Sequence, residues 1–179
     1  MAAQTARVMR PYDPVVTATP PQILYETMAM GVDETTSVPI LDYMLATWFA
    51  WYQEGGQMPE WPRFRPFDHP QVLPHISLYE RIGPRYRCSL VGEEAGRSMP
   101  VRMAGRMLDE AMPAENLADA TRRMDTALGS GIPNFVEKTM AWQPGHDLRT
   151  YRTLQLPFAG REGANARVMV VMNFRSERV

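Results

Sequence analysis

The stretch VLPHISLYERIGPRYRCSLVG, residues 72–92, decides how the rest of the chain is interpreted. Two runs typical of β-strands, His75–Ile82 and Arg85–Val91, lie on either side of the dipeptide Gly83-Pro84. A Gly-Pro pair between two such runs is a turn signal, so the stretch predicts an antiparallel hairpin. It contains no recognised catalytic motif and therefore indicates an architecture rather than a chemistry.

The composition is that of a globular protein. A chain of 179 residues, 45% hydrophobic and 22% charged, is long enough for one domain with a buried core. The formal net charge of -1 argues against a nucleic-acid-binding protein, which normally carries a basic surface. Cys88 is the only cysteine, so an intramolecular disulfide and a cysteine-based metal cluster are excluded. With no signal-peptide pattern and no apolar run near the ~20 residues of a membrane span, we expect a cytoplasmic protein.

The N-terminal part predicts an arm and then a helix. Residues 1–36 contain several prolines and no sustained hydrophobic period, so we expect a poorly ordered arm. The segment SVPILDYMLATWFAWYQEGG, residues 37–56, predicts an amphipathic helix with Ser37 as N-cap and Gly55 past its end.

The apolar surface of this helix is wider than one small domain usually covers. We therefore expect part of it to contact a partner, which for this helix includes a second copy of the chain. Aromatic side chains dominate interface energetics, and the candidate partner surface is made of Tyr43, Trp48, Trp51 and Tyr52. The alternative is that the helix is simply well buried.

Residues 37–71 comprise this helix and a proline-rich connector, and residues 72–179 form the core. Because each proline fixes its φ angle and restricts the residue before it, we expect an extended connector with one turn near Asp68.

The remaining elements follow from local patterns. Residues 93–113 predict short helical turns, and ENLADATRRMDTALGSG, residues 115–131, predicts the second long helix. Residues 132–142 and 147–158 predict a second hairpin, and RVMVVMNF, residues 167–174, a final and more apolar strand. The order is therefore a helix, two strands, a helical middle and three strands.

That order resembles a PAS domain, an α+β fold with a five-stranded antiparallel sheet and helices across one face, here preceded by the amphipathic helix. Locally the chain is similar to a single-PAS-domain family of proteobacterial proteins of unknown function. The resemblance covers about residues 37–175 and is carried by LDYMLATWFAW (41–51), LPHISLYE (73–80), YRCSLVGEEAGR (86–97), AGRMLDE (104–110) and the three C-terminal strands. In one departure, Ser89 stands where the family commonly has an arginine.

The resemblance implies a sensory or protein-interaction module rather than an enzyme. PAS relatives bind small molecules between the sheet and the longer helix, and often dimerise through a helix before the first strand. Most carry an output domain on the same chain, for which we find no room in 179 residues. We therefore expect a standalone regulator that reaches a separate output protein.

No cofactor is predicted. Haem-binding relatives usually place an axial histidine on or just after the longer helix, whereas the histidines here are His69, His75 and His146, which we interpret as capping or surface residues. Light-sensing relatives need a reactive cysteine in the small-helix segment, but Cys88 lies on a predicted strand. The positions of the histidines and of Cys88 therefore argue against haem and flavin as cofactors.

A small apolar ligand stays open as a hypothesis. Its pocket is expected from alternate strand positions and the apolar helix face: Tyr86, Cys88, Leu90, Met107, Leu108, Leu117, Met124, Met140, Trp142, Leu154 and Met172. In particular, Tyr86, Cys88 and Leu90 are expected to point to the same side of their strand. Flexible methionines can either fill a core or adapt to a ligand. A constitutive adaptor with a filled core is therefore the alternative.

The third hypothesis is an enzyme, and we predict that the chain is not an enzyme. An isomerase-type site would combine a pocket aspartate and tyrosine. The candidates are Asp109, Glu110, Asp119, Asp125, Tyr79 and Tyr151. The acidic residues fall mostly on polar helix faces, where solvation and pairing with Arg122 and Arg123 explain them. No phosphate-binding loop, nucleophile elbow or metal-ligand spacing is present.

Overall fold

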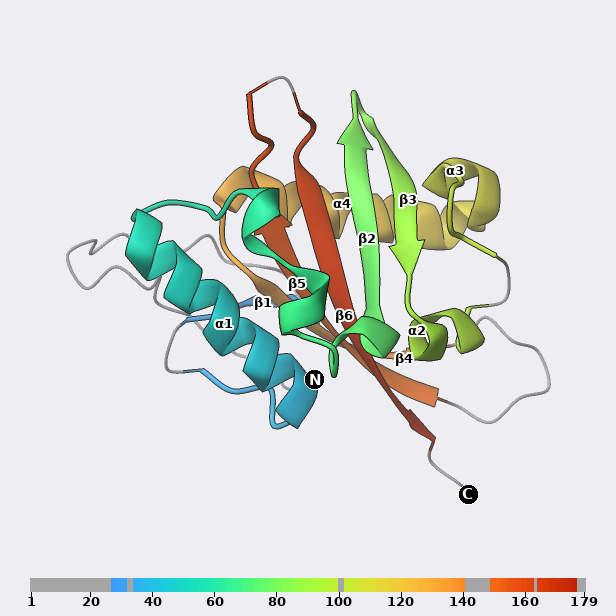
Figure 1. The fold of residues 1–179 in the computed structure, drawn as a ribbon. Coiled ribbons are helices and arrows are strands. Elements are labelled where there is room, and N and C mark those ends of the chain that lie inside the picture. Colours follow the sequence, from blue (N-terminus) through green and yellow to red (C-terminus); the bar gives the residue numbers. More distant parts are fainter. Residues whose placement is uncertain (1–26, 32–33, 100–101, 141–148, 163, 177–179) are drawn as a thin grey trace, which may run out of the picture.

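The computed structural model describes residues 27–31, 34–99, 102–140, 149–162 and 164–176. These contain a six-stranded antiparallel sheet in the order β1-β4-β5-β6-β2-β3 (Figure 1). The strands are β1 (Thr27–Ala29), β2 (Ile76–Ile82), β3 (Arg85–Val91), β4 (Asn134–Met140), β5 (Arg149–Phe158) and β6 (Arg167–Ser176). The helices are α1 (Pro39–Gly55), α2 (Glu93–Arg97), α3 (Leu108–Ala111) and α4 (Ala114–Ser130), with short 3-10 turns η1 (Trp61–Arg63), η2 (Pro66–Asp68) and η3 (Leu73–His75).

The predicted order of elements is confirmed: α1, the β2–β3 hairpin, a helical middle and three strands follow one another along the chain. The two halves of the sheet meet where β2 pairs with β6, so Ile76 lies opposite Val171 and Tyr79 opposite Val168. The predicted turn between residues 142 and 147 lies outside the described residues. The strands that flank it, β4 and β5, pair antiparallel as expected.

Helices cover both faces of the sheet: α2 to α4 lie across one face, as the sequence predicted, and the N-terminal helix α1 covers the other. In Figure 1, α1 lies in front of the strands and α4 passes behind them. The α1-side core combines the inner face of α1 with residues such as Leu78, Leu156 and Val171. The α4-side core lies on the opposite face and includes Tyr79 and Val170.

The central strands therefore supply apolar side chains in both directions. Along β6, Val168, Val170 and Met172 point into the α4-side core, and Met169 and Val171 point into the α1-side core. This explains why the last strand is apolar throughout instead of alternating with polar residues.

The predicted arm is shorter than expected, because part of it belongs to the folded body. β1 pairs with the start of β4, with Met28 opposite Phe135, and Ala29 and Met30 are buried in the α1-side core. The predicted boundary at residue 36 is wrong for this segment; residues 1–26 lie outside the described residues. An isolated three-residue strand carries no pattern that sequence reasoning detects.

A carboxylate from inside α1 holds the segment before the helix, and Ser37 is not the N-cap. Ser37 has a positive φ of 59° and Val38 occupies the N-cap position, with no side-chain cap of its own. The Asp42 carboxylate accepts hydrogen bonds from the Thr36 N–H (2.6 Å) and from the hydroxyls of Thr36 (2.7 Å) and Thr35 (2.7 Å). Burial raises the pKa of Asp42, but these hydrogen bonds outweigh burial and hold that pKa below its usual value.

The segment between α1 and β2 forms three short 3-10 turns, two of them in the predicted connector, rather than one turn in an extended chain. Each turn has a proline at its first or second position, where the fixed φ angle suits helical geometry. The turns carry Trp61 and Phe64 onto the α1-side core. This packing accounts for the wide apolar surface of α1, which is covered by the sheet and by the connector together.

No helix among the described residues is long and apolar enough to cross a membrane.

Gly92 is where the first hairpin meets the connector most closely. Its N–H donates to the Ile76 carbonyl at 2.7 Å, and a Cβ added to it would lie 2.0 Å from the Leu73 carbonyl oxygen. Because the obstructing atoms of Leu73 and Pro74 all belong to the backbone, no side-chain rotation relieves the clash. Gly92 therefore fixes η3 against the end of β3.

Gly92→Ala is expected to lower the free energy of unfolding by about 1–3 kcal/mol, because backbone must move to admit the methyl group. Gly129→Ala is the matched control, since nothing lies within 4 Å of its added Cβ and it sits within α4. That control should raise stability by about 0.5–1 kcal/mol. Urea unfolding of both variants checks this, and equal stability for the two would contradict the close approach.

Candidate functional site

The hairpin tip, α3 and one side of α4 line an open groove with a volume of about 750 Å³. This size is within the range of small-molecule sites, roughly 300–1,000 Å³. The groove is lined by Pro84, Arg85, Tyr86, Leu108, Asp109, Ala114, Leu117, Ala118, Thr121, Arg122, Asp125 and Thr126. Its α4 residues recur every three or four positions, so they form one flank of the helix.

Tyr86 connects the groove with the α4-side core. Its side chain is buried, and its hydroxyl donates a 2.8 Å hydrogen bond to Oδ1 of Asp125. A guanidinium nitrogen of Arg81 lies 3.5 Å from the same oxygen. Burial, and then the neighbouring Asp125 carboxylate, raise the pKa of Tyr86, so the phenol keeps its proton and remains a donor.

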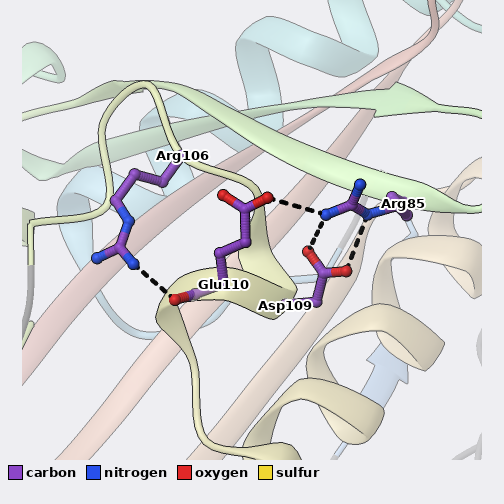
Figure 2. A network of polar contacts seen from close by, with 4 residues as sticks. All are labelled: Arg85, Arg106, Asp109 and Glu110. Atoms are coloured by element: carbon purple, nitrogen blue, oxygen red, sulfur yellow. Dashed lines mark hydrogen bonds and ion pairs between the residues drawn. The ribbon is translucent and has the colours of Figure 1, made fainter.

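Arg85 ties the hairpin tip to α3 (Figure 2). Its guanidinium donates to both carboxylate oxygens of Asp109 at 2.8 Å and to Glu110 at 3.1 Å. Arg106 donates to the backbone carbonyl of Glu110 at 2.6 Å from the other side. The hydrogen bonds from Arg85, and then its positive charge, lower the pKa of Asp109. These groups are exposed, so the contacts position α3 more than they stabilise the fold.

The structure brings together six of the residues predicted for a ligand pocket. They lie in or against the α4-side core: Tyr86, Cys88, Leu108, Leu117, Met124 and Met172. Of these, Tyr86, Leu108 and Leu117 also line the groove. The groove therefore lies beside the predicted pocket and shares these three residues with it.

Two predicted pocket residues lie on the opposite face of the sheet. Leu154 belongs to the α1-side core, because it pairs with Phe135 and Val171, whose side chains share that face. Leu90 lies opposite Leu78, another α1-side residue, and is 36% exposed. Placing Leu90 and Leu154 in the pocket was therefore wrong.

A β-bulge explains the position of Leu90. The pairing of β2 with β3 shifts between Leu78 and Tyr79, so these neighbours lie opposite Leu90 and Cys88 with Ser89 left between the two pairs. One extra residue in a strand reverses the faces of the residues after it. The strict alternation expected along β3 ends at Cys88.

The other predicted pocket residues are not assigned to this core. Met107 is half-buried at the N-cap of α3, where it forms a bridge with Arg87. Trp142 lies outside the described residues, and only the backbone of Met140 is described, at the end of β4. The pocket hypothesis therefore rests on the residues around Tyr86 and α4.

Beneath α4 the sheet carries a row of buried polar side chains. Ser77 lies opposite Val170, Val170 opposite Gln155, and Gln155 opposite Asn134. Asn134 donates through Nδ2 to the Arg123 carbonyl at 3.3 Å. Its Oδ1 and the Oε1 of Gln155 have no hydrogen-bond partner within the part of the chain that the structure describes. Buried acceptors of this kind favour a donor from water or from a ligand.

The predicted partner surface on α1 is only partly exposed. Trp48 is buried: its indole N–H donates to the Pro157 carbonyl at 2.8 Å and its ring stacks on Tyr52 at 5.5 Å. Assigning Trp48 to a partner surface was therefore wrong. Trp51 and Tyr52 are half-buried, while Tyr43 is 37% exposed.

His69 joins the exposed side of α1 to the connector. The Tyr43 hydroxyl lies 2.7 Å from His69 Nδ1, and the Trp51 ring packs edge-on against the same imidazole. Phe67, two residues earlier, is 94% exposed. Together with Ala46 and Ala50, which are exposed on α1, these residues define what we call the α1 surface: Tyr43, Ala46, Ala50, Phe67 and His69.

The charged residues are arranged mostly as predicted. Asp119 lies 2.5 Å from Arg122 and 3.1 Å from Arg123, so this part of α4 is a salt-bridged face. Asp125 is the exception, because it pairs with Tyr86 across 39 residues of sequence. Within the described residues, no three His, Cys, Asp or Glu side chains converge as a metal site requires.

Sequence reasoning missed the joint position of Arg85, Tyr86 and Asp125 at one groove. The recurrence of Leu117, Thr121 and Asp125 at helical spacing marks one flank of α4, but nothing in the sequence shows that the hairpin tip lies beside that flank.

Comparisons with known proteins find low similarity. No protein-family model matches the chain, and no curated protein matches it. The PAS domain of Bordetella pertussis BvgS is 15% identical, with a TM-score of 0.46, over 63% of this chain and 86% of that one. An RNA-binding Light-Oxygen-Voltage receptor is 13% identical, with a TM-score of 0.42, over 82% of this chain. The match spans 37% of that receptor.

The burial of Cys88 predicts a pH dependence of stability. Burial raises the pKa of the Cys88 thiol from 9.0 to about 11, so above pH 9 the unfolded chain releases a proton that the folded chain retains. Stability should therefore fall as the pH rises from 9 to 11, with a slope approaching about 1.4 kcal/mol per pH unit. Burial also raises the pKa of Tyr79 and Tyr86, which adds to the decline above their usual value of 10.0.

Urea unfolding at a series of pH values tests this, with Cys88→Ala as the matched variant. Between pH 9 and 10 the variant should decline less steeply than the wild type, because only its tyrosines contribute there. Parallel slopes for the two proteins in that interval would show that the thiol is not protected in the folded state.

Proposed function

We propose that the chain is a PAS-type sensory module that binds a small molecule in the groove and signals through protein contacts on its α1 surface. The observation that carries the proposal is the groove of about 750 Å³, in which predicted pocket residues Tyr86, Leu108 and Leu117 line one continuous opening. The resemblance to single-PAS proteins supports a regulatory role, and the order of elements agrees with it.

The α4-side core beside the groove supports a ligand response. Met103, Met124 and Met172 are buried in it, with Met99 and Met112 packed against it. Unbranched thioether side chains rearrange more readily than the aromatic residues of the α1-side core. A ligand in the groove can therefore be accommodated by side-chain movement on this face of the sheet.

The ligand acts only if it binds two arrangements of the protein with different affinity. We place the change at α3, a helix of four residues held to the hairpin tip by exposed contacts of Arg85. The hairpin can relay it, since Tyr79 faces the α4-side core while its neighbour Leu78 faces the α1-side core. Both cores share the central strands, so a shift on one face changes packing on the other.

The α1 surface is the proposed contact with a second copy of the chain. The resulting dimer is the proposed partner of a separate output protein. Its exposed helical positions, Tyr43, Ala46 and Ala50, are uncharged, and exposed Phe67 lies on the adjoining turn. Small uncharged residues allow another helix to approach closely, and an exposed aromatic ring beside them supplies an anchor.

Native mass spectrometry of freshly purified protein, followed by denaturation, tests ligand binding. We expect a bound small molecule that is released on denaturation, and its loss in Ala118→Trp, which fills the groove from an exposed position of α4. Ala46→Trp, the same change on an exposed position of α1, should retain the molecule. A bare protein in both variants and in the wild type would favour the constitutive adaptor.

Ala46→Glu tests the interface, because a charge at the centre of the α1 surface opposes close contact between two copies. The variant should have half the mass of the wild type in analytical ultracentrifugation. Ala118→Glu, an equivalent exposed change on α4, should leave the mass unchanged. If Ala46→Glu and the wild type have the same mass, the α1 surface is not the dimer contact.

A further inference from the structure

We infer that the groove selects an amphipathic amine, whose protonated nitrogen binds the Asp125 carboxylate while its apolar part packs on Leu117, Ala118 and Pro84. This inference rests on the proposed function and names the ligand class for the same groove. It follows from which polar atoms of the groove are already engaged and which are not.

Asp125 is the groove carboxylate with an oxygen left for a ligand. Its Oδ1 accepts the Tyr86 hydroxyl and lies near Arg81, while no contact to its Oδ2 is present in the described part of the chain. Asp109, by contrast, has both oxygens bound by Arg85 at 2.8 Å. The Asp125 side chain is 43% exposed, so a ligand can reach it.

The guanidinium groups of the groove are less able to bind an anion. Arg85 is shared between Asp109 and Glu110, and Arg122 lies 2.5 Å from Asp119. An anionic ligand must displace one of these carboxylates, which are already in hydrogen-bonding geometry. A cation at Asp125 Oδ2 displaces neither partner of this carboxylate, because the Tyr86 hydroxyl and the Arg81 guanidinium, at 3.5 Å, both lie at Oδ1.

Tyr86 prepares Asp125 for this role. Its hydroxyl donates to Oδ1 at 2.8 Å and so restrains the carboxylate, while Oδ2 stays available to another donor. Next to it on the same flank of α4, Thr121 and Leu117 lead from the polar end of the groove to its apolar end. A molecule with a charged nitrogen at one end and an apolar body matches this sequence of polar and apolar lining.

Three probes with one apolar body separate the ligand classes: 2-phenylethylamine, the neutral 2-phenylethanol and the anionic 3-phenylpropionate. Isothermal titration of the full chain at pH 7.5 should show amine binding that is roughly ten- to a hundredfold tighter than alcohol or carboxylate binding. Added salt should weaken the amine complex, because its main polar contact is between charges.

Asp125→Asn tests the residue, since the amide oxygen still accepts the Tyr86 hydroxyl but the charge is lost. We expect a loss of amine affinity of at least about tenfold, with alcohol affinity unchanged. Asp109→Asn is the matched control at a carboxylate already engaged by Arg85, and should change amine affinity by less than about threefold. Thermal unfolding of each variant establishes that it is folded.

The outcomes separate this inference from the proposed function. If all three probes bind alike and Ala118→Trp abolishes each of them, the groove is a ligand site but the amine assignment is wrong. If the amine binds equally to wild type, Asp125→Asn and Ala118→Trp, it binds elsewhere and the inference fails. If no probe binds while native mass spectrometry finds a molecule lost in Ala118→Trp, the sensor proposal stands and the amine class is excluded.

Discussion

The need to bury both faces of one antiparallel sheet governs this structure. Antiparallel sheets commonly leave one face to solvent, but here β2 and β6 send apolar side chains in both directions. Each face then requires its own cover, and the chain supplies α1 with the connector on one side and α2 to α4 on the other. The burial of Trp48 on the inner face of α1 and of Met124 on the inner face of α4 follows from this single requirement.

The same constraint explains what the sequence predicted and what it did not. Elements with strong local signals, such as the Gly83-Pro84 hairpin and the helix ending at Gly131, were predicted nearly to the residue. The side of the sheet to which a strand residue points depends on register, which local patterns do not contain. Leu90 was misplaced by one bulged residue, and Leu154 because the alternation along β5 does not reveal which helix its apolar face meets.

The two long helices, α1 and α4, illustrate a related limit. A wide apolar surface on α1 indicated a partner, because the sequence does not reveal that Trp61 and Phe64 return to cover it. In the groove the limit is one of distance along the chain. In the sequence, Asp125 is one more charge on a polar helix face. The fold brings the hydroxyl of Tyr86, 39 residues away, within 2.8 Å of its carboxylate. Chemistry that depends on long-range pairs becomes visible only once the topology is known.

β1 has a consequence for how the protein can be handled. It covers only the first part of β4, with Ala29 opposite Asn134, and no strand lies beyond it in the described residues. A truncated version beginning at α1 would bare the whole backbone edge of β4, a template on which strands of neighbouring molecules can pair. Such a preparation would self-associate through backbone hydrogen bonds between strands, and not through α1. Its measured mass would then differ from that of the native assembly.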